Sequence, residues 1–238
     1  MHKVPELSIF FPFWNEQDNI EDVIKKAIPV AQKVADKWEI IMVDDGSADK
    51  TPEIGQRLAK QDSRLSVVSH EKNRGYGAAL KTGFARAKYN LVVFNDGDGQ
   101  FDFSEVTKFL ERIENTDMVI GFRKRRLDNP FRHLLMNMLK VWDLVLFGFH
   151  FKDIDCGFKL FKKEALNKIL PFQSEGAMIT TEILAKAQKA HLKIVQVEVS
   201  HYPRIYGNQS GGNLRVILRA VKESLLLWKD LNLNYGRN

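Results

Sequence analysis

The sequence predicts an α/β protein whose mainly parallel sheet is covered by helices on both faces. Two observations lead to this class. Short apolar runs alternate with segments of helical spacing through the first half of the chain, and each strand–helix repeat takes about 25 residues. Sheets of this kind bind ligands at the carboxyl ends of their strands. Residues that directly follow the predicted strands are therefore the first candidates for function.

The first half of the chain supplies the regular repeats. Its apolar runs predict strands at residues 7–11, 39–43, 65–69, 91–95 and 117–121. Between them, apolar residues recur every three or four positions and predict helices at residues 20–37, 51–61, 75–88 and 104–115.

After Gly121 the alternation of strands and helices stops. Large apolar residues at helical spacing predict an amphipathic helix at about residues 131–150, and a second helix is expected at residues 214–233 within the C-terminal stretch 213–238. Residues 205–213 are rich in Gly and Asn and predict a loop. We expect one domain over residues 1–238, with its regular half at 1–121, an irregular part at 122–212 and a terminal helix at 213–238.

Charge and composition limit the function classes. The 238 residues include 36 Lys and Arg and 30 Asp and Glu, and residues 121–168 alone hold 11 basic and 5 acidic side chains. This basic segment suits either a phosphate-bearing partner or an ordinary solvated face. The single cysteine, Cys156, excludes an internal disulfide framework and favours a reducing compartment. The longest uncharged apolar stretches, 7–14 and 144–151, are far shorter than the roughly 18 residues of a membrane span.

Two adjacent carboxylates follow the second predicted strand. Asp44 and Asp45 open the run DDGSADKT, in which Gly46 permits a tight turn and Asp49 suits the start of the next helix. Neighbouring carboxylates repel each other unless hydrogen bonds engage at least one of them. We therefore expect this pair to bind the base or ribose of a nucleotide.

Three oxygen-bearing side chains follow the fourth predicted strand. Asp96, Asp98 and Gln100 alternate with Gly97 and Gly99, and small residues let a ligand approach the backbone. Alternating carboxylate and amide oxygens suit Mg²⁺ or Mn²⁺, which completes its coordination with phosphate. An EF-hand is excluded because the later ligands of that motif are missing. An ordinary turn is the alternative interpretation.

A glycine-rich segment, NRGYGA at residues 73–78, follows the third predicted strand and opens a helix. It fits either a plain helix start or an anion site at a helix N-terminus. The dinucleotide fingerprint and the P-loop lysine are both absent, which disfavours a dehydrogenase or a P-loop kinase.

Together these motifs resemble those of the family 2 inverting glycosyltransferases of GT-A fold, in particular the dolichyl-phosphate mannose synthase-like enzymes that attach a sugar to a polyprenyl phosphate. The matching residues occur in family order over about residues 7–210. They are Pro12, Asn15, Glu16, the runs 44–51, 73–78 and 96–100, Gly121, Arg123, the run 153–159, Arg204, Gly207 and Ser210.

The resemblance implies a role for each matching region. The donor, a nucleoside diphosphate sugar, would be bound by Pro12, Asn15, Glu16, Asp44, Asp45, Gly75 and Asp96. Asp96, Asp98 and Gln100 would hold Mg²⁺ or Mn²⁺ on its diphosphate. Catalytic candidates are Arg123, Arg204, Asp153 and Asp155, since arginine binds phosphate charge and an aspartate orients the acceptor or takes its proton. Candidates for acceptor binding are Arg126, Arg132, Glu182 and Ser210.

Two departures from the family pattern bear on these roles. Gly97 and Gly99 stand where the family usually has Ala and Leu, which preserves every oxygen ligand. The loop reads RIYGNQS from Arg204 to Ser210, without the lysine that usually follows, so the identity of the acceptor is left open.

A polyprenyl acceptor also implies a place for the enzyme. Its phosphate lies at the membrane surface, so we expect a peripheral protein at the cytoplasmic face, with an integral-membrane partner protein as an allowed addition. The apolar side of the helix at 131–150 would enter the interface, while basic residues at 123–126 and Arg132 face lipid phosphates. The residues of that apolar side are Leu134, Leu135, Met138, Trp142, Leu146 and Phe149.

Three other functions remain to be weighed. A related enzyme would glycosylate a saccharide hydroxyl and would need an acidic base, such as Glu182 or Asp155. A non-catalytic nucleotide-sugar-binding protein is disfavoured by the intact metal motif. A nucleic-acid binder is suggested by charge alone, and aromatic residues are not interleaved with the basic run as base stacking requires.

Overall fold

The computed structural model describes residues 3–123, 142, 144–206 and 214–233. Its strands are β1 (Val4–Phe13), β2 (Ala35–Asp44), β3 (Leu65–Ser69), β4 (Leu91–Asn95), β5 (Met118–Arg123), β6 (Phe158–Lys162) and β7 (Ile194–Val199). Its helices are α1 (Ile20–Val34), α2 (Thr51–Gln61), α3 (Tyr76–Arg86), the short 3₁₀ helix η1 (Phe103–Glu105), α4 (Val106–Ile113), α6 (Lys163–Ile169), α7 (Ile179–Lys189) and α8 (Leu214–Leu233).

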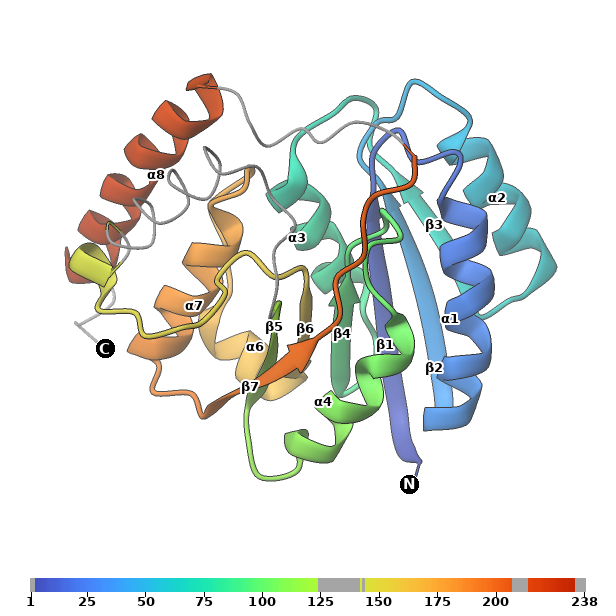
Figure 1. Ribbon diagram of the computed structural model, residues 1–238, viewed down its shortest axis with the longest axis horizontal. Coiled ribbons are helices and arrows are strands. Elements are labelled where there is room, and N and C mark those ends of the chain that lie inside the picture. Colours follow the sequence, from blue (N-terminus) through green and yellow to red (C-terminus); the bar gives the residue numbers. More distant parts are fainter. Residues whose placement is uncertain (1–2, 124–141, 143, 207–213, 234–238) are drawn as a thin grey trace.

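These strands form one sheet in the order β3-β2-β1-β4-β6-β5-β7. All neighbouring pairs are parallel except those of β6, which runs antiparallel to both β4 and β5. The parallel, two-sided α/β class predicted from the sequence is therefore confirmed (Figure 1). The antiparallel strand brings residues 153–158 to the edge where β4 ends, because Phe158 pairs with Asn95.

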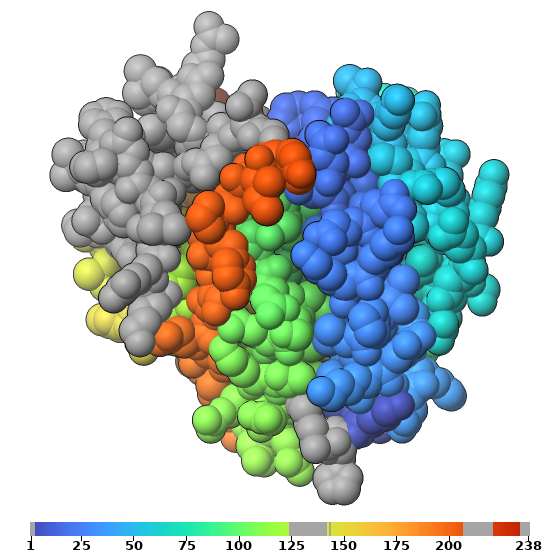
Figure 2. Space-filling view, turned by 45° about the vertical axis from the view of Figure 1, so that its right-hand side comes forward, coloured from blue at the N-terminus to red at the C-terminus, as the bar shows by residue number. Residues whose placement is uncertain are grey.

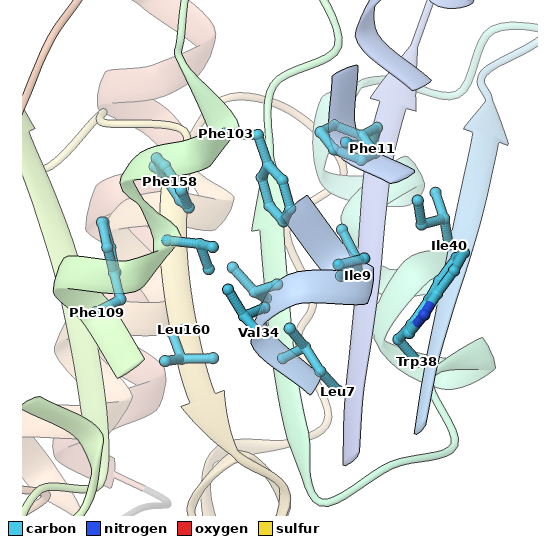
Figure 3. Packing of buried hydrophobic residues seen from close by; sticks show 14 of the residues in the cluster. Leu7, Ile9, Phe11, Val34, Trp38, Ile40, Phe103, Phe109, Phe158 and Leu160 are labelled. Carbon is cyan, nitrogen blue, oxygen red and sulfur yellow. The ribbon is translucent and has the colours of Figure 1, made fainter. Parts of the chain in front are cut away.

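Apolar side chains cover both faces of the sheet. On one face, alternate residues of β1 pack with α1, α2 and α4, and Figure 3 shows Leu7, Ile9 and Phe11 in this cluster. On the other face, Phe10 packs with α3, α6 and α7. A side chain at Gly83 of α3 would meet the Phe10 ring at 2.2 Å, so this glycine lets the helix lie close to the sheet.

The first half of the fold matches the predicted elements closely, with one notable difference. The helix expected to reach residue 37 ends at Val34, and β2 begins at Ala35 with extended backbone. The reason is tertiary: Trp38 pairs with Leu7 of β1, and residues 35–44 complete a long parallel ladder. Strand pairing overrides the local helical spacing.

The second half differs more. We had predicted none of β6, α6 and β7, and most of the helix expected at 131–150 lies outside the described residues. Its described end is helical over residues 144–147, and Gly148, with φ 67°, closes it by donating its N–H to the Leu144 carbonyl at 2.8 Å. Phe149 is buried between Phe147 and Phe151, so its expected insertion into a membrane interface is wrong.

The predicted C-terminal helix is present as α8. Its Leu227 and Leu231 are buried in the cluster that contains α7, whereas Leu225, Leu226 and Trp228 are exposed. Trp142 donates its indole N–H to the Ser224 hydroxyl at 2.8 Å and so links the preceding segment to α8. Within the described ranges, no helix has both the length and the apolar character needed to cross a membrane.

Candidate functional site

The polar residues singled out by the sequence gather at the edge where β1, β2 and β4 end. The segment after β7 runs toward this same edge, in orange in Figures 1 and 2. There the Tyr202 N–H donates to the Gln100 backbone carbonyl at 2.8 Å. Residues far apart in the chain, 12–16, 96–100, 153–157 and 200–206, therefore lie around one region.

Asp96 is the most constrained carboxylate of this region. Its Oδ1 accepts a hydrogen bond from the Tyr76 hydroxyl at 2.7 Å, and its backbone N–H donates to the Gly157 carbonyl at 3.0 Å. A side chain at Gly157 would lie 1.9 Å from Asp96 Oδ2, so only glycine fits beside the carboxylate. Burial first, and then the nearby Asp98, raise the pKa of Asp96 to about 6, against the opposing hydrogen bond from Tyr76.

Asp98 lies within a small charged network. Arg204 Nη1 is 3.6 Å from Asp98 Oδ2, and Nη2 of the same guanidinium forms an ion pair with Glu16. Glu16 also accepts a hydrogen bond from Asn19 at 2.6 Å. Burial raises the pKa of Glu16, and its contacts with Asn19 and Arg204 oppose that rise. The arginine thus joins the loop after β7 to both strand ends.

These residues fit a divalent cation that is shared with a diphosphate. Within the described residues, no three His, Cys, Asp or Glu side chains gather closely enough to hold a metal ion by themselves. Mg²⁺ is commonly held by one or two carboxylates together with substrate phosphates, and Asp96 and Asp98 supply that number. Their mutual repulsion is what a cation between them would relieve. Gln100 is buried and donates its amide N–H to the Tyr202 carbonyl at 2.9 Å, so its role as a ligand stays a prediction.

Arg123 and Asp153 form a second polar pair. The Arg123 Nε and Nη2 groups donate to the two oxygens of Asp153 at 2.6 and 3.0 Å, a bidentate arrangement, and Asp153 is buried. Burial lowers the pKa of Arg123, but the contacts with Asp153 outweigh it and raise the pKa overall. Asp155, two residues on, is exposed.

The adjacent pair Asp44 and Asp45 accepts hydrogen bonds from the neighbouring loops. Asp45 accepts hydrogen bonds from His70 Nδ1 at 2.7 Å and from the backbone N–H groups of Arg74 and Gly75 at 3.0 and 2.8 Å. Asp44 accepts from the Ser47 N–H at 3.1 Å. Both carboxylates are buried. The oxygens of Asp45 hold the loop before α3, and the contact of this pair with a base or ribose stays a prediction.

The first strand end is tied to the same loops. Asn15, with φ 54°, accepts a hydrogen bond from the Ala48 N–H at 2.9 Å, and its own N–H donates to Ser47. Asn15 is exposed, whereas Pro12 is buried opposite Val43 in the β1–β2 ladder. Both residues lie at the predicted edge, and their contact with a nucleotide stays a prediction.

Gly75 lies at the start of α3, where the backbone is held by other parts of the protein. Its N–H donates to Asp45, and the N–H groups of Gly77 and Ala78, in the first turn of α3, donate to the Glu175 carbonyl at 2.9 and 3.3 Å. These three donors are engaged within the protein, which favours the plain helix start, and a contact of Gly75 with the nucleotide sugar stays a prediction. The glycines are explained by packing, because a side chain at Gly75 would lie 2.4 Å from the Glu175 oxygen.

Glu182 is a buried structural residue rather than an acceptor-binding group. Its two oxygens accept the N–H groups of Gln173 and Ser174 at 2.8 and 2.7 Å, and Lys186 lies 2.7 Å away. The side chain is fully buried on α7. The prediction that it serves as an acceptor contact or base is wrong, since it fixes the loop that carries Glu175.

Three predicted residues, Arg126, Arg132 and Ser210, lie outside the described residues. Two residues of the site were not predicted. Tyr76 contacts Asp96, and Lys159 is fully buried, donating to the carbonyls of Ile154 (3.2 Å) and Cys156. Burial lowers the pKa of Lys159. The signal for Tyr76 was its place between two glycines, and Lys159 stood in a recognised motif, CGFK, without an assigned role.

Comparison with known proteins identifies the class. The chain belongs to glycosyl transferase family 2, which it matches over residues 8–170. It therefore carries a glycosyltransferase domain, and the resemblance predicted from the motifs is confirmed.

Particular relatives narrow the class. Dolichyl-phosphate beta-glucosyltransferase of Saccharomyces cerevisiae is 31% identical over 223 residues, covering 82% of this chain and 66% of that protein. The protein of the same name from Dictyostelium discoideum is 34% identical over 220 residues, covering 82% and 65%. Undecaprenyl-phosphate 4-deoxy-4-formamido-L-arabinose transferase of Proteus mirabilis is 25% identical over 217 residues, covering 90% and 65%. The chain thus spans about two thirds of the length of these relatives.

A solved structure agrees with the fold. Glucosyl-3-phosphoglycerate synthase from Mycobacterium tuberculosis, in complex with Mn²⁺, uridine diphosphate and glucosyl-3-phosphoglycerate, superimposes with a TM-score of 0.70 at 25% identity. The match covers 94% of this chain and 80% of that one. The GT-A type of fold is confirmed.

Proposed function

We propose that this chain transfers a sugar, with inversion, from a nucleoside diphosphate sugar to a dolichyl or undecaprenyl phosphate. The observation that carries the proposal is the crowded pair Asp96 and Asp98 at the end of β4, with Arg204 beside it. The names of the relatives, which are polyprenyl-phosphate sugar transferases, support the class of acceptor. Residues 1–121 would bind the donor, residues 122–212 the acceptor, and residues 213–238 would adjoin the membrane.

At the donor end, Asp96, Asp98 and Gln100 would hold Mg²⁺ or Mn²⁺ on the diphosphate. The cation would neutralise charge that grows on the departing diphosphate. Arg204, on the loop after β7, would also stabilise the negative charge of the departing diphosphate. Its guanidinium already lies between Glu16 and Asp98. Pro12, Asn15, Glu16, Asp44 and Asp45 would surround the nucleoside.

At the acceptor end, Arg123 is the phosphate-binding candidate. Asp153 holds its guanidinium through both oxygens and so fixes its direction. Asp153 is a weak candidate for a base for the same reason, and the exposed Asp155 is better placed to meet the acceptor. A phosphate monoester has its second pKa near 6 and is mostly ionised at pH 7, so little general base catalysis is required.

A saccharide hydroxyl is the second candidate acceptor. Transfer to a hydroxyl would require a positioned general base, for which the sequence offers Glu182 and Asp155. Glu182 is buried and binds two backbone amides, so only Asp155 is left for that role. This favours the phosphate acceptor. One in-line displacement by its oxygen at the anomeric carbon gives inversion.

A polyprenyl acceptor requires access to a membrane surface, which we assign to the cytoplasmic face. Leu225, Leu226 and Trp228 of α8 are exposed, and Val145 is 74% exposed on the segment that Trp142 links to α8. Replacing Leu226 and Trp228 together with glutamate is expected to reduce flotation with liposomes that contain anionic lipid. Unchanged flotation would contradict peripheral binding through α8.

The test of function is a panel of nucleoside diphosphate sugars with short-chain undecaprenyl or dolichyl phosphate analogues and Mg²⁺ or Mn²⁺. Mass spectrometry of the lipid product identifies donor and acceptor in one experiment. We expect a glycosyl phosphate lipid that forms with the metal and not with a chelator. A product on an added saccharide in place of the lipid would favour the second candidate. Transfer by the purified chain alone would show that no integral-membrane partner is required.

A further inference from the structure

Tyr76 joins the glycine-rich segment to the acidic motif. It is the first residue of α3, and its hydroxyl donates to Asp96 Oδ1 at 2.7 Å. None of the roles assigned above uses this residue. The Tyr76 hydroxyl contacts Asp96, one of the two carboxylates that we assign to the metal. Tyr76 would therefore affect the cation through Asp96 and not by direct contact.

The backbone on both sides of Tyr76 is anchored. Gly75 donates its N–H to Asp45 Oδ2 at 2.8 Å, and Gly77 donates to the Glu175 carbonyl at 2.9 Å. Neither glycine leaves room for a side chain, because added Cβ atoms would lie 2.4 and 2.5 Å from the carbonyl oxygens of Glu175 and Ser174. The position of the phenol is therefore determined by the loop that Glu182 fixes.

Asp96 is confined on its other side as well. Gly157 packs against the carboxylate so closely that a Cβ there would meet all three of its terminal atoms within 2.4 Å. With Gly157 on one side and Tyr76 on the other, the carboxylate has one orientation. Hydrogen bonds from outer residues to ligating carboxylates orient the ligand, and their removal typically costs 10–100-fold in metal affinity.

We propose that Tyr76 is a positioning residue for the divalent cation, acting by orienting the Asp96 carboxylate. The inference rests on the proposed metal dependence. A phenol in this place supplies a single directed donor, and phenylalanine would keep the ring while removing that donor. The expected effect of Tyr76→Phe is therefore specific to the cation rather than to folding.

The experiment measures Mn²⁺ binding directly. The electron paramagnetic resonance signal of free Mn²⁺ is followed while protein is titrated, with Mn²⁺ alone and again with uridine diphosphate. We expect about tenfold weaker Mn²⁺ binding for Tyr76→Phe, at a melting temperature close to that of the wild type. Tyr89→Phe is the matched control, because Tyr89 lies just before β4, at the opposite end of that strand from Asp96.

The outcomes separate the two proposals. If the wild type binds Mn²⁺ and Tyr76→Phe binds it equally well, the positioning role is wrong and the metal assignment stands. If the wild type does not bind Mn²⁺ under either condition, the metal-dependent function is contradicted and the role of Tyr76 with it. Equal weakening in Tyr76→Phe and Tyr89→Phe would also overturn the inference.

Discussion

Two pairs of aspartates at the same edge of the sheet have opposite surroundings. Asp44 and Asp45 follow β2, and Asp96 and Asp98 follow β4, on either side of β1. The first pair accepts hydrogen bonds from His70 and from three backbone N–H groups. In the second pair, burial and the repulsion of Asp98 raise the pKa of Asp96 to about 6.

The difference shows that the protein engages one carboxylate pair with its own donors and leaves the other in a repulsive arrangement that suits a cation. Donors supplied by the protein satisfy the oxygens of Asp45, and these hydrogen bonds hold the loop before α3 in place. Asp96 and Asp98 have fewer such donors and repel each other, so binding a cation would lower the electrostatic energy of this pair. Both pairs are aspartates at the same edge of the sheet, but Asp44 and Asp45 are adjacent whereas Gly97 separates Asp96 from Asp98. The protein also supplies the second pair with fewer hydrogen bonds.

The largest expected effect belongs to the second pair. Asp98→Ala should lower sugar transfer by about 100-fold or more, because it removes charge that stabilises the metal and diphosphate in the transition state. Initial rates of lipid product, measured by mass spectrometry, check this. Asp18→Ala removes an exposed carboxylate near β1 and serves as the control with unchanged rate. Full transfer by Asp98→Ala would remove the metal assignment.

The sequence was enough to place the second pair but not to explain the first. Alternating oxygen ligands after an apolar strand indicate a cation site, and the structure is consistent with that use of Asp96 and Asp98. For Asp45, the deciding partners are His70 and the amides of residues 74 and 75, which lie 25 to 30 positions away in sequence. Spacing within one motif does not reveal donors that arrive from another loop.

The same reasoning explains the fold. Strands in the first half are parallel and separated by helices, so local periodicity identifies them. β6 pairs antiparallel with β4 and β5 and follows a segment without regular spacing, which left it unpredicted. The role of Glu182 was predicted wrongly because the sequence pattern of a helical glutamate is the same whether its side chain faces solvent or a buried loop. Only packing shows that it binds the amides of Gln173 and Ser174.

A second prediction concerns stability at the first pair. Asp45→Ala removes the acceptor for His70 and two backbone amides in a buried place, which should cost about 2–3 kcal/mol of the free energy of unfolding. Urea denaturation measures the cost. Mn²⁺ affinity of the folded variant should stay within about twofold of the wild type, since Asp45 is assigned no contact with the cation. A variant of wild-type stability with impaired nucleotide binding would show instead that the main role of Asp45 is to bind the base or ribose.

A third prediction uses the pKa of Asp96. Burial and Asp98 raise it to about 6, so protons compete with the cation for this carboxylate below that pH. Mn²⁺ affinity should be nearly constant from pH 8 to 7 and fall by up to about tenfold per pH unit below 6. Isothermal titration at each pH measures the trend. Affinity that is flat down to pH 5 would mean that Asp96 does not bind the cation.

The smallest expected effect is that of replacing Cys156, and it tests whether a raised pKa is enough to identify a functional residue. Cys156 lies beside Gly157, fully buried, and burial raises the pKa of its thiol to about 12. A thiol of this kind is inert because little thiolate forms and reagents do not reach it. We expect no reaction with a disulfide reagent in the folded protein, prompt reaction in urea, and transfer within about twofold of wild type for Cys156→Ala. A reactive thiol, or a large loss of transfer, would place Cys156 in the chemistry. An inert thiol would show that a raised pKa does not by itself mark a functional site, so the case for the metal site rests on the neighbouring carboxylates Asp96 and Asp98 and on Arg204 beside Asp98.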